Sequence, residues 1–236
     1  MALNSKWGGG KTLVGGTAFD IPFASGVPLS TITPGAILYL NESGSPVPFY
    51  IAKHDYESGL NGAGRTLVVR KDCYDMRVFS NSSDSRNGYE YSALDSWLCN
   101  TYLKLLDIDI QTAIGTTKFY YTPRYRESDT TVGTLRRAVF QLSLTEFGKS
   151  SSSANVEGEA LPIASTLQNA FLNGSRSIQW TRTPTSGNNN YVFFLGALGG
   201  VNTYSYYNSA GSRPAFTLPA ITAVIANPDG TYTLAA

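Results

Sequence analysis

The sequence contains few of the residues that many enzyme active sites and metal centres require. Its 236 residues include one histidine, His54, and two cysteines, Cys73 and Cys99. A Ser-His-Asp triad needs a histidine as its base, and a zinc site needs several histidines or cysteines at close spacing. His54 lies beside Asp55 and Tyr56 in a polar stretch typical of a locally bonded surface side chain. We therefore expect no catalytic histidine, no metal and no cofactor.

Charge is also scarce. Only 15% of the residues are charged, and the formal net charge is +1, whereas a typical domain has about 25% charged residues. No block of five like charges occurs, and the densest basic stretches, Tyr121–Arg126 and Arg136–Arg137, are short. A protein that follows nucleic-acid phosphates needs a basic face. We therefore expect no nucleic-acid partner.

Long apolar runs are absent too. None approaches the roughly 18 residues of a membrane span, and Met1–Gly8 shows no basic stretch followed by an apolar signal-peptide core. We expect a protein made in the cytoplasm, without membrane insertion. Two cysteines are too few for a disulfide scaffold, so buried small side chains are favoured over a bridge or a metal site.

The residues that are abundant favour an α+β fold with many loops. Runs of about five apolar residues between Gly, Asn and Ser clusters predict short antiparallel strands. These runs are 36–40, 48–52, 66–70, 215–218 and 222–225. Apolar residues at helical spacing predict a helix from Ser92, with Asp95 completing a capping box, through Leu106. A shorter helix is predicted over Asp107–Ile114, and a single capped turn over Ser143–Gly148.

Two regions differ in composition. Residues 1–33 are rich in Gly and small residues and are expected to form an extended arm, either docked on a neighbouring subunit or flexible. Residues 34–236 are expected to form one domain. We expect a homo-oligomer whose symmetry stays open, because no coiled-coil heptads occur.

One positive functional signal is a concentration of Tyr, Asn and Ser. Tyrosine offers a large, rigid contact area, and Asn and Ser offer adaptable hydrogen bonds, as in antibody paratopes. Aromatic faces also stack on sugar rings while amides bond the hydroxyls. The alternative is that these tyrosines pack against one another. The candidate ligand-binding residues are Asn188, Asn189, Asn190, Tyr191, Asn202, Tyr204, Tyr206, Tyr207 and Asn208.

Carboxylates leave an enzymatic alternative open, because the separation of a glycosidase pair is a three-dimensional quantity. The candidates are Asp95, Asp107, Asp109, Glu146, Glu157 and Glu159. Calcium is disfavoured, since the pairs Asp72/Asp75 and Asp107/Asp109 lie in no EF-hand-like loop.

Several segments together resemble one family. They are 65–72, 96–102, 142–148, Trp180–Pro184 and Gly211–Pro219. The last two are similar to W-L-R-S-P followed by G-V-R-P-A-L-x-L-P, the signature of an uncharacterised domain family of phages and prophages. Members of this family often occur among tail or minor structural proteins. The resemblance covers residues 34–226, although Thr181 and Thr183 depart from the pattern.

The resemblance implies a C-type-lectin-like fold, in which the termini pair as strands, two helices flank a small sheet and long loops carry the ligand. The structural residues would be Trp97, Trp180, Arg182, Arg213 and Pro214. The calcium-binding triplets of lectins and the copper-binding cysteine pair of sulfatase-modifying enzymes are not recognisable, so those activities are not implied.

The resulting hypothesis is a non-enzymatic phage virion protein, released by cell lysis. It would be fixed to virion subunits by the arm and would bind a host-surface glycan or protein through the Tyr/Asn/Ser face. One alternative is a capsid or tail decoration protein with a structural role. A second is a glycan-degrading enzyme.

Overall fold

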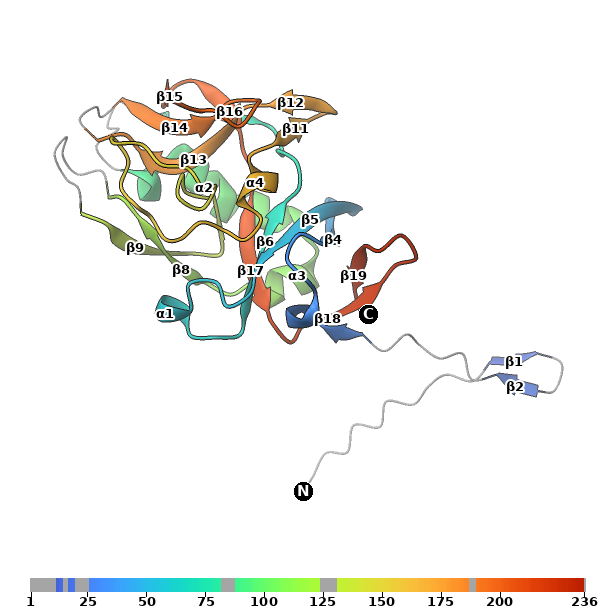
Figure 1. Cartoon of the computed structure of the whole chain (residues 1–236). Helices are drawn as coiled ribbons and strands as arrows, with labels where there is room; N and C mark the ends of the chain where they lie inside the picture. The colour runs from blue at the N-terminus through green and yellow to red at the C-terminus, as the bar shows by residue number, and fades with distance from the viewer. Residues whose placement is uncertain are drawn as a thin grey trace.

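The structure is a computed structural model that describes residues 12–14, 17–19, 26–81, 88–123, 131–186 and 190–235. Within these residues the fold is mixed α+β, with many short strands, few helices and no sheet that closes into a barrel (Figure 1). The predicted fold class is therefore confirmed at this level.

The larger sheet has eight strands. Their order is β10 (Val139–Phe140), β17 (Ala215–Pro219), β6 (Arg65–Arg70), β5 (Ser45–Lys53), β4 (Ile37–Glu42), β19 (Tyr232–Leu234), β18 (Ala223–Ala226) and β3 (Val27–Pro28). Every neighbouring pair is antiparallel except β19 and β4, which run parallel. The five apolar runs predicted as strands all contribute to this sheet.

The second sheet has five strands and carries three of the predicted ligand-binding residues, Tyr191, Asn202 and Tyr204. Its order is β15 (Val201–Ser205), β14 (Tyr191–Leu195), β13 (Gln179–Pro184), β16 (Ser209–Gly211) and β7 (Met76–Val78). Three further pairs are two-stranded. They are β1 (Thr12–Val14) with β2 (Thr17–Phe19), β8 (Thr117–Tyr121) with β9 (Gly133–Arg137), and β11 (Ala170–Leu172) with β12 (Ser175–Ser177).

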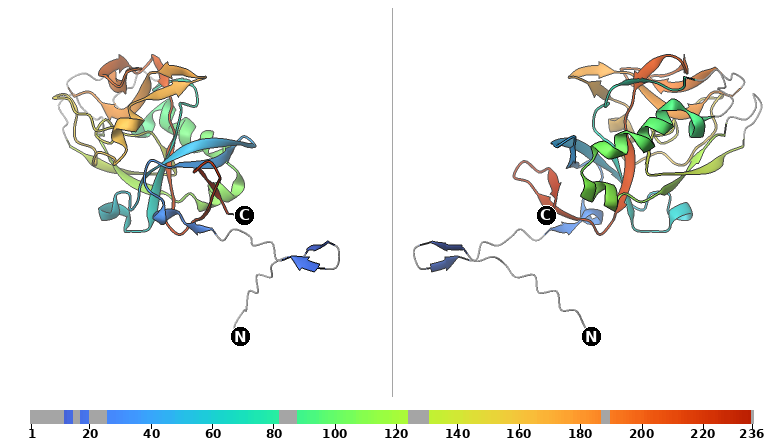
Figure 2. Two further views of the ribbon diagram at one scale, coloured as in Figure 1. Left: turned by 45° about the vertical axis from the view of Figure 1, so that its right-hand side comes forward. Right: turned by 180° about the vertical axis from the view of Figure 1, so that it is seen from behind.

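The helices are short. They are α1 (Ser58–Asn61), α2 (Ala93–Asn100), α3 (Ile108–Ala113) and α4 (Ala164–Leu167), with 3₁₀ turns at Leu29–Thr31, Tyr89–Tyr91 and Tyr102–Leu105. α2 and α3 lie on one side of the body, which the right-hand view of Figure 2 turns toward the reader. Among the described residues, no helix is long and apolar enough to cross a membrane.

α2 begins as predicted but ends earlier. The Ser92 side chain accepts a hydrogen bond of 3.0 Å from the Asp95 amide, which confirms the helix start. The helix ends at Asn100, and residues 102–105 form a 3₁₀ turn instead of continuing to Leu106. The Leu105 carbonyl accepts from the Ser43 amide at 2.6 Å. This contact ties the 3₁₀ turn to the β4–β5 turn through a carbonyl that has no donor at a helix end.

Part of the range predicted as an arm contributes to the body. β3 pairs with β18, and the Leu29 side chain is fully buried in the core. Cys73 and Cys99 are both free thiols, Cys73 buried and Cys99 half-buried.

Candidate ligand-binding face

The candidate residues that the structure describes lie just before β14, on β14, on β15 and in the turn that follows β15. Asn188 and Asn189 lie outside the described residues. Asn190 and Asn202 are exposed, the Tyr191 side chain is 38% exposed, and Asn208 is half-buried. β15 is an edge strand of its sheet, so this side of the molecule is open to a partner.

The strand register turns Tyr204 toward the body. β15 pairs Tyr204 with Val192 and Asn202 with Phe194, and directly opposed residues in an antiparallel pair share a face. The Tyr204 ring packs 5.2 Å from the Phe194 ring and 6.1 Å from the Trp180 ring, centroid to centroid. Tyr204 is therefore half-buried, with its ring joined to the aromatic core.

Tyr206 and Tyr207 divide into a buried and an exposed ring. Tyr206 is 4% exposed, whereas Tyr207 is 50% exposed. The Tyr206 carbonyl accepts hydrogen bonds from the Phe79 and Ser80 amides, both at 3.0 Å, and the two tyrosine ring centroids lie 4.0 Å apart. A hydrogen bond with Tyr206 raises the pKa of Tyr207. The exposed ring of Tyr207 therefore packs against the buried ring of Tyr206.

Trp180 and Arg213 hold the strands beneath this face. The Trp180 indole nitrogen donates to the Arg77 carbonyl at 2.7 Å. The guanidinium of Arg213, fully buried, donates to the carbonyls of Arg70 at 2.8 Å and Leu167 at 2.6 Å, and also to that of Lys71. A guanidinium with five donors can join three segments in this way.

Two more of the five residues that the resemblance marks as structural, Pro214 and Trp97, lie close by. The Pro214 carbonyl accepts from the Arg70 amide at 2.9 Å. Trp97 is half-buried, and the Arg77 guanidinium lies 3.5 Å from the centre of its ring.

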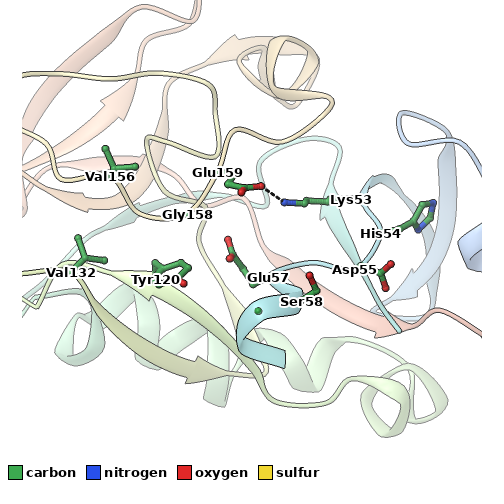
Figure 3. Close-up of a pocket in the computed structure, with 11 residues that line it drawn as sticks. Lys53, His54, Asp55, Glu57, Ser58, Tyr120, Val132, Val156, Gly158 and Glu159 are labelled. Atoms are coloured by element: carbon green, nitrogen blue, oxygen red, sulfur yellow. Dashed lines mark hydrogen bonds and ion pairs between the residues drawn. The ribbon is translucent and has the colours of Figure 1, made fainter. Parts of the chain in front are cut away.

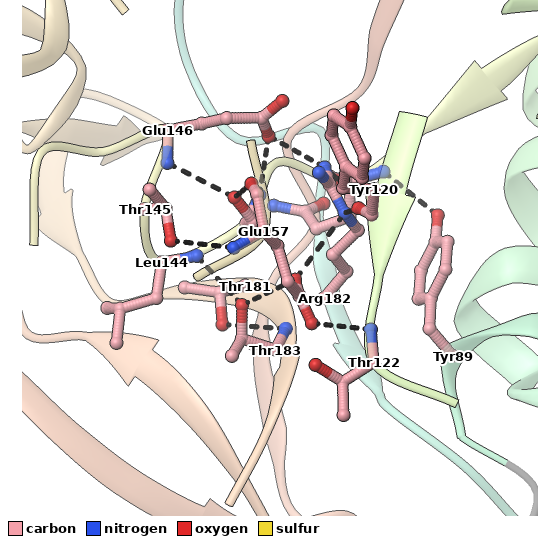
Figure 4. A network of polar contacts seen from close by, with 12 residues as sticks. Tyr89, Tyr120, Thr122, Leu144, Thr145, Glu146, Glu157, Thr181, Arg182 and Thr183 are labelled. Atoms are coloured by element: carbon pink, nitrogen blue, oxygen red, sulfur yellow. Dashed lines mark hydrogen bonds and ion pairs between the residues drawn. The ribbon is translucent and has the colours of Figure 1, made fainter. Parts of the chain in front are cut away.

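Arg182 is the centre of a buried charged network (Figure 4). Its Nη1 atom donates to Glu146 Oε2 at 2.6 Å, and its Nε atom donates to the Tyr120 carbonyl at 2.9 Å. Glu157 Oε2 lies 3.7 Å from Arg182 Nε and accepts from the Thr183 hydroxyl at 2.9 Å. Both carboxylates are fully buried, so neither is open to a substrate.

The same network explains the predicted turn at Ser143. Ser143 and Glu146 exchange backbone-to-side-chain hydrogen bonds of 2.7 and 3.1 Å, which is the reciprocal capping-box pattern. The other oxygen of Glu146 accepts from the Tyr56 hydroxyl.

The remaining candidate carboxylates are dispersed. Asp95 is buried against Arg137 at 2.8 Å, Asp107 accepts from Asn41 at 2.8 Å, and Glu159 pairs with Lys53 at 3.1 Å. Asp109 is exposed on α3. In the described part of the chain, no group of three or more His, Cys, Asp or Glu residues is arranged to hold a metal ion.

Sequence reasoning missed the residues that fix the two tyrosines. Phe79 and Ser80 act through backbone amides, which leave no mark on the sequence. The segment Tyr191–Leu195 does not alternate polar and apolar residues, so only the register with β15 shows which tyrosine turns inward.

The fold and this face define an α+β domain with a tyrosine- and amide-lined sheet edge. Residues 63–220 match the family model described as a domain of unknown function, DUF6273, and the chain belongs to that family. The match begins just before β6 and ends just after β17, so it leaves out five strands of the larger sheet, β3, β4, β5, β18 and β19. No curated protein and no solved structure matches the chain.

Proposed function

We propose that the chain is a non-enzymatic phage virion protein with a C-type-lectin-like fold. It binds a host-surface glycan or protein through the Tyr/Asn/Ser face of β14, β15 and the following turn. Virion subunits hold it through the N-terminal arm, and it acts as a homo-oligomer.

The arrangement of the strands supports the fold assignment. β3 and β4, early in the chain, lie beside β18 and β19 in one sheet, as expected where the two ends of a domain pair. α2 and α3 lie on one side, and the candidate face belongs to a separate sheet. The paired ends and the flanking helices support this proposal.

The observation that carries the binding proposal is the exposure of two large aromatic side chains, Tyr207 and Tyr191, beside Asn190, where β14 begins and β15 ends. Tyr207 is 50% and Tyr191 38% exposed, and Asn190 and Asn202 are exposed as well. Tyrosines held by a packed framework bind with little loss of side-chain entropy. Burial of Glu146 and Glu157 against Arg182 also removes two of the carboxylates on which a hydrolase would depend.

The binding proposal is tested with purified protein on an array of bacterial surface polysaccharides and on intact bacterial cells. We expect Tyr207→Ala and Tyr191→Ala each to weaken binding at least tenfold, as for a central interface tyrosine. Tyr91→Ala is the matched control, because Tyr91 is 70% exposed on the 3₁₀ turn before α2. Equal binding by all three variants and the wild type would remove this face as the ligand site.

The location on a particle is tested separately, by immunogold labelling of intact phage with antibody against this chain. Label at the tail tip or fibres supports attachment. Label spread over the head indicates a decoration protein. Particles without label contradict the virion assignment.

A further inference from the structure

A pocket lies at α1, far from the Tyr/Asn/Ser face. It is a pocket of about 680 Å³ between α1, β8 and the 156–159 segment. Its lining includes Lys53, Asp55, Glu57, Tyr120, Val132 and Val156. Both views in Figure 2 place α1 and β15 at opposite ends of the body.

The pocket has an apolar end and a charged end. Figure 3 shows Val132, Val156 and Tyr120 together on one side, and Lys53 and Asp55 on the other, with Glu57 between them. Three carboxylates line the pocket against one lysine, and that lysine is already paired with Glu159 at 3.1 Å. The unbalanced charge favours a cation.

The three carboxylates differ in their contacts: Asp55 accepts a hydrogen bond from the Gly64 amide and Glu159 pairs with Lys53, whereas Lys53 and Arg182 attract Glu57 only at longer range. Among the described residues, no hydrogen bond or ion pair reaches its carboxylate, although the side chain is half-buried. Burial raises the pKa of Glu57, and the nearby charge of Glu146 adds to the increase. A half-buried carboxylate has lost part of its contact with water, and a bound cation would supply a favourable interaction in its place.

The backbone that carries Glu57 into the pocket adopts an unusual conformation on both sides of Tyr56. Asp55 and Glu57 both have left-handed backbones, with φ of 50° and 48°, on either side of the fully buried Tyr56. Gly158 lies so close that a Cβ atom there would be 2.6 Å from Glu57 Oε1. Gly158 has φ of +86°, a backbone conformation that favours glycine, and a side chain there would displace the Glu57 carboxylate.

His54 does not compete for the ligand. Its Nε2 atom lies 2.7 Å from the Ile32 carbonyl, which can only accept, so that nitrogen carries a proton. Its Nδ1 atom lies 2.9 Å from the Thr66 hydroxyl. Both ring nitrogens are therefore engaged within the protein.

We propose that this pocket binds a primary alkylammonium group, such as a lysine side chain of a partner. The ammonium lies against the Glu57 carboxylate, and its hydrocarbon stem lies along Tyr120 and the two valines. A cation beside an aromatic face gains further attraction from the ring. This site is additional to the proposed function and does not depend on it.

The test is an amide NMR titration of the full chain with Nα-acetyl-lysine N-methylamide. We expect saturable shifts at Ser58, Gly59 and Gly158, all of which line the pocket. The Nε-acetylated analogue keeps the stem but loses the charge, and it should bind at least tenfold more weakly. Glu57→Gln should weaken binding of the amine by about tenfold. Asp109→Asn changes an exposed carboxylate outside the pocket and should bind as the wild type does.

Three results would overturn the proposal: no saturable shift, equal binding of the neutral analogue, or wild-type affinity in Glu57→Gln. A second readout needs no variant. In the wild type, bound amine should lower the pKa of Glu57, followed by its side-chain carboxyl NMR signal, and an unchanged titration contradicts the proposed contact. Tyr207→Ala should leave both readouts unchanged, which separates this site from the Tyr/Asn/Ser face.

Discussion

Two fully buried arginines stabilise this domain in different ways. Arg213 meets backbone carbonyls and the Gln179 side chain, and burial lowers its pKa. Burial also acts to lower the pKa of Arg182, but the charges around it, above all Glu146, outweigh this effect, and its pKa is raised. Arg182 is thus stabilised by opposite charges, whereas Arg213 is stabilised by hydrogen bonds to neutral acceptors.

Removal of Arg182 leaves two buried carboxylates without a cation. We expect Arg182→Met to lower the free energy of unfolding by about 3–5 kcal/mol, the usual loss when one partner of a buried pair is removed. Urea denaturation measures the loss. Arg176→Met removes an exposed arginine and should change stability by less than about 0.5 kcal/mol.

The combined variant Arg182→Met, Glu146→Gln, Glu157→Gln separates charge from packing. It should regain part of the lost stability, because the buried carboxylates have then lost their charge. A triple variant less stable than the single one would show that hydrogen bonding of these groups outweighs their charge.

At this scale the sequence indicates which residues matter but not their partners. Trp180, Arg182 and Arg213 stand out through the family resemblance. Their acceptors are carbonyls and carboxylates of distant segments, such as Tyr120 and Leu167, and main-chain acceptors look alike in every sequence.

Secondary-structure elements are predictable from the sequence where neighbouring residues determine them. Short apolar runs become strands of the larger sheet, and Ser92 starts α2 through its own side chain. Beyond Asn100 the chain forms a 3₁₀ turn in contact with the β4–β5 turn, and the apolar spacing that predicts a helix to Leu106 does not report this contact. The inward turn of Tyr204 depends on strand register in the same way. Local patterns cannot report contacts between segments 60 residues apart or more, such as Ser43 with Leu105.

β16 packs closely against its neighbours at Gly211. It lies between β13 and β7, and a Cβ atom on Gly211 would overlap the Cys73 sulfur and lie 2.6 Å from the Ile178 carbonyl oxygen. We expect Gly211→Ala to cost about 1–3 kcal/mol through overpacking. Thermal denaturation would show the loss as a lower Tm.

Gly200→Ala is the control for that measurement, since nothing lies within 4 Å of the added carbon. It should keep the wild-type Tm to within a few degrees. A Tm for Gly211→Ala equal to that of the control would mean that β16 can move away without cost.

For the whole molecule, a titratable cluster joins α2 to the β8–β9 pair. Arg137 on β9 binds both oxygens of Asp95, at 3.0 and 2.8 Å, and Tyr121 on β8 donates to Glu90 at 3.2 Å. Burial raises the pKa of Asp95 from 3.8 to about 6, and it raises that of Glu90 to about 6 as well. Between about pH 4 and about pH 6 the folded state therefore holds more protons than the unfolded chain does.

This excess of protons gives the domain a pH-dependent stability. The contribution of Asp95 and Glu90 is fully present below about pH 4 and is lost as the pH rises toward about 6. Urea denaturation from pH 4 to 7 should show a decline that is smaller in Asp95→Asn than in the wild type. Asp109→Asn should retain the wild-type decline. An undiminished decline in Asp95→Asn would place its origin in other groups.

The order of strands in the larger sheet also governs when this domain can fold. β17 pairs Ala215 with Val69 on β6 and Phe216 with Val139 on β10. It therefore lies between two strands that are synthesised much earlier. Contacts between such distant residues slow folding, because the chain must lose entropy before they form. During synthesis the edges of β6 and β10 stay unpaired until residues 215–219 have left the ribosome. Until then, those edges are open to pairing with other chains or with a chaperone.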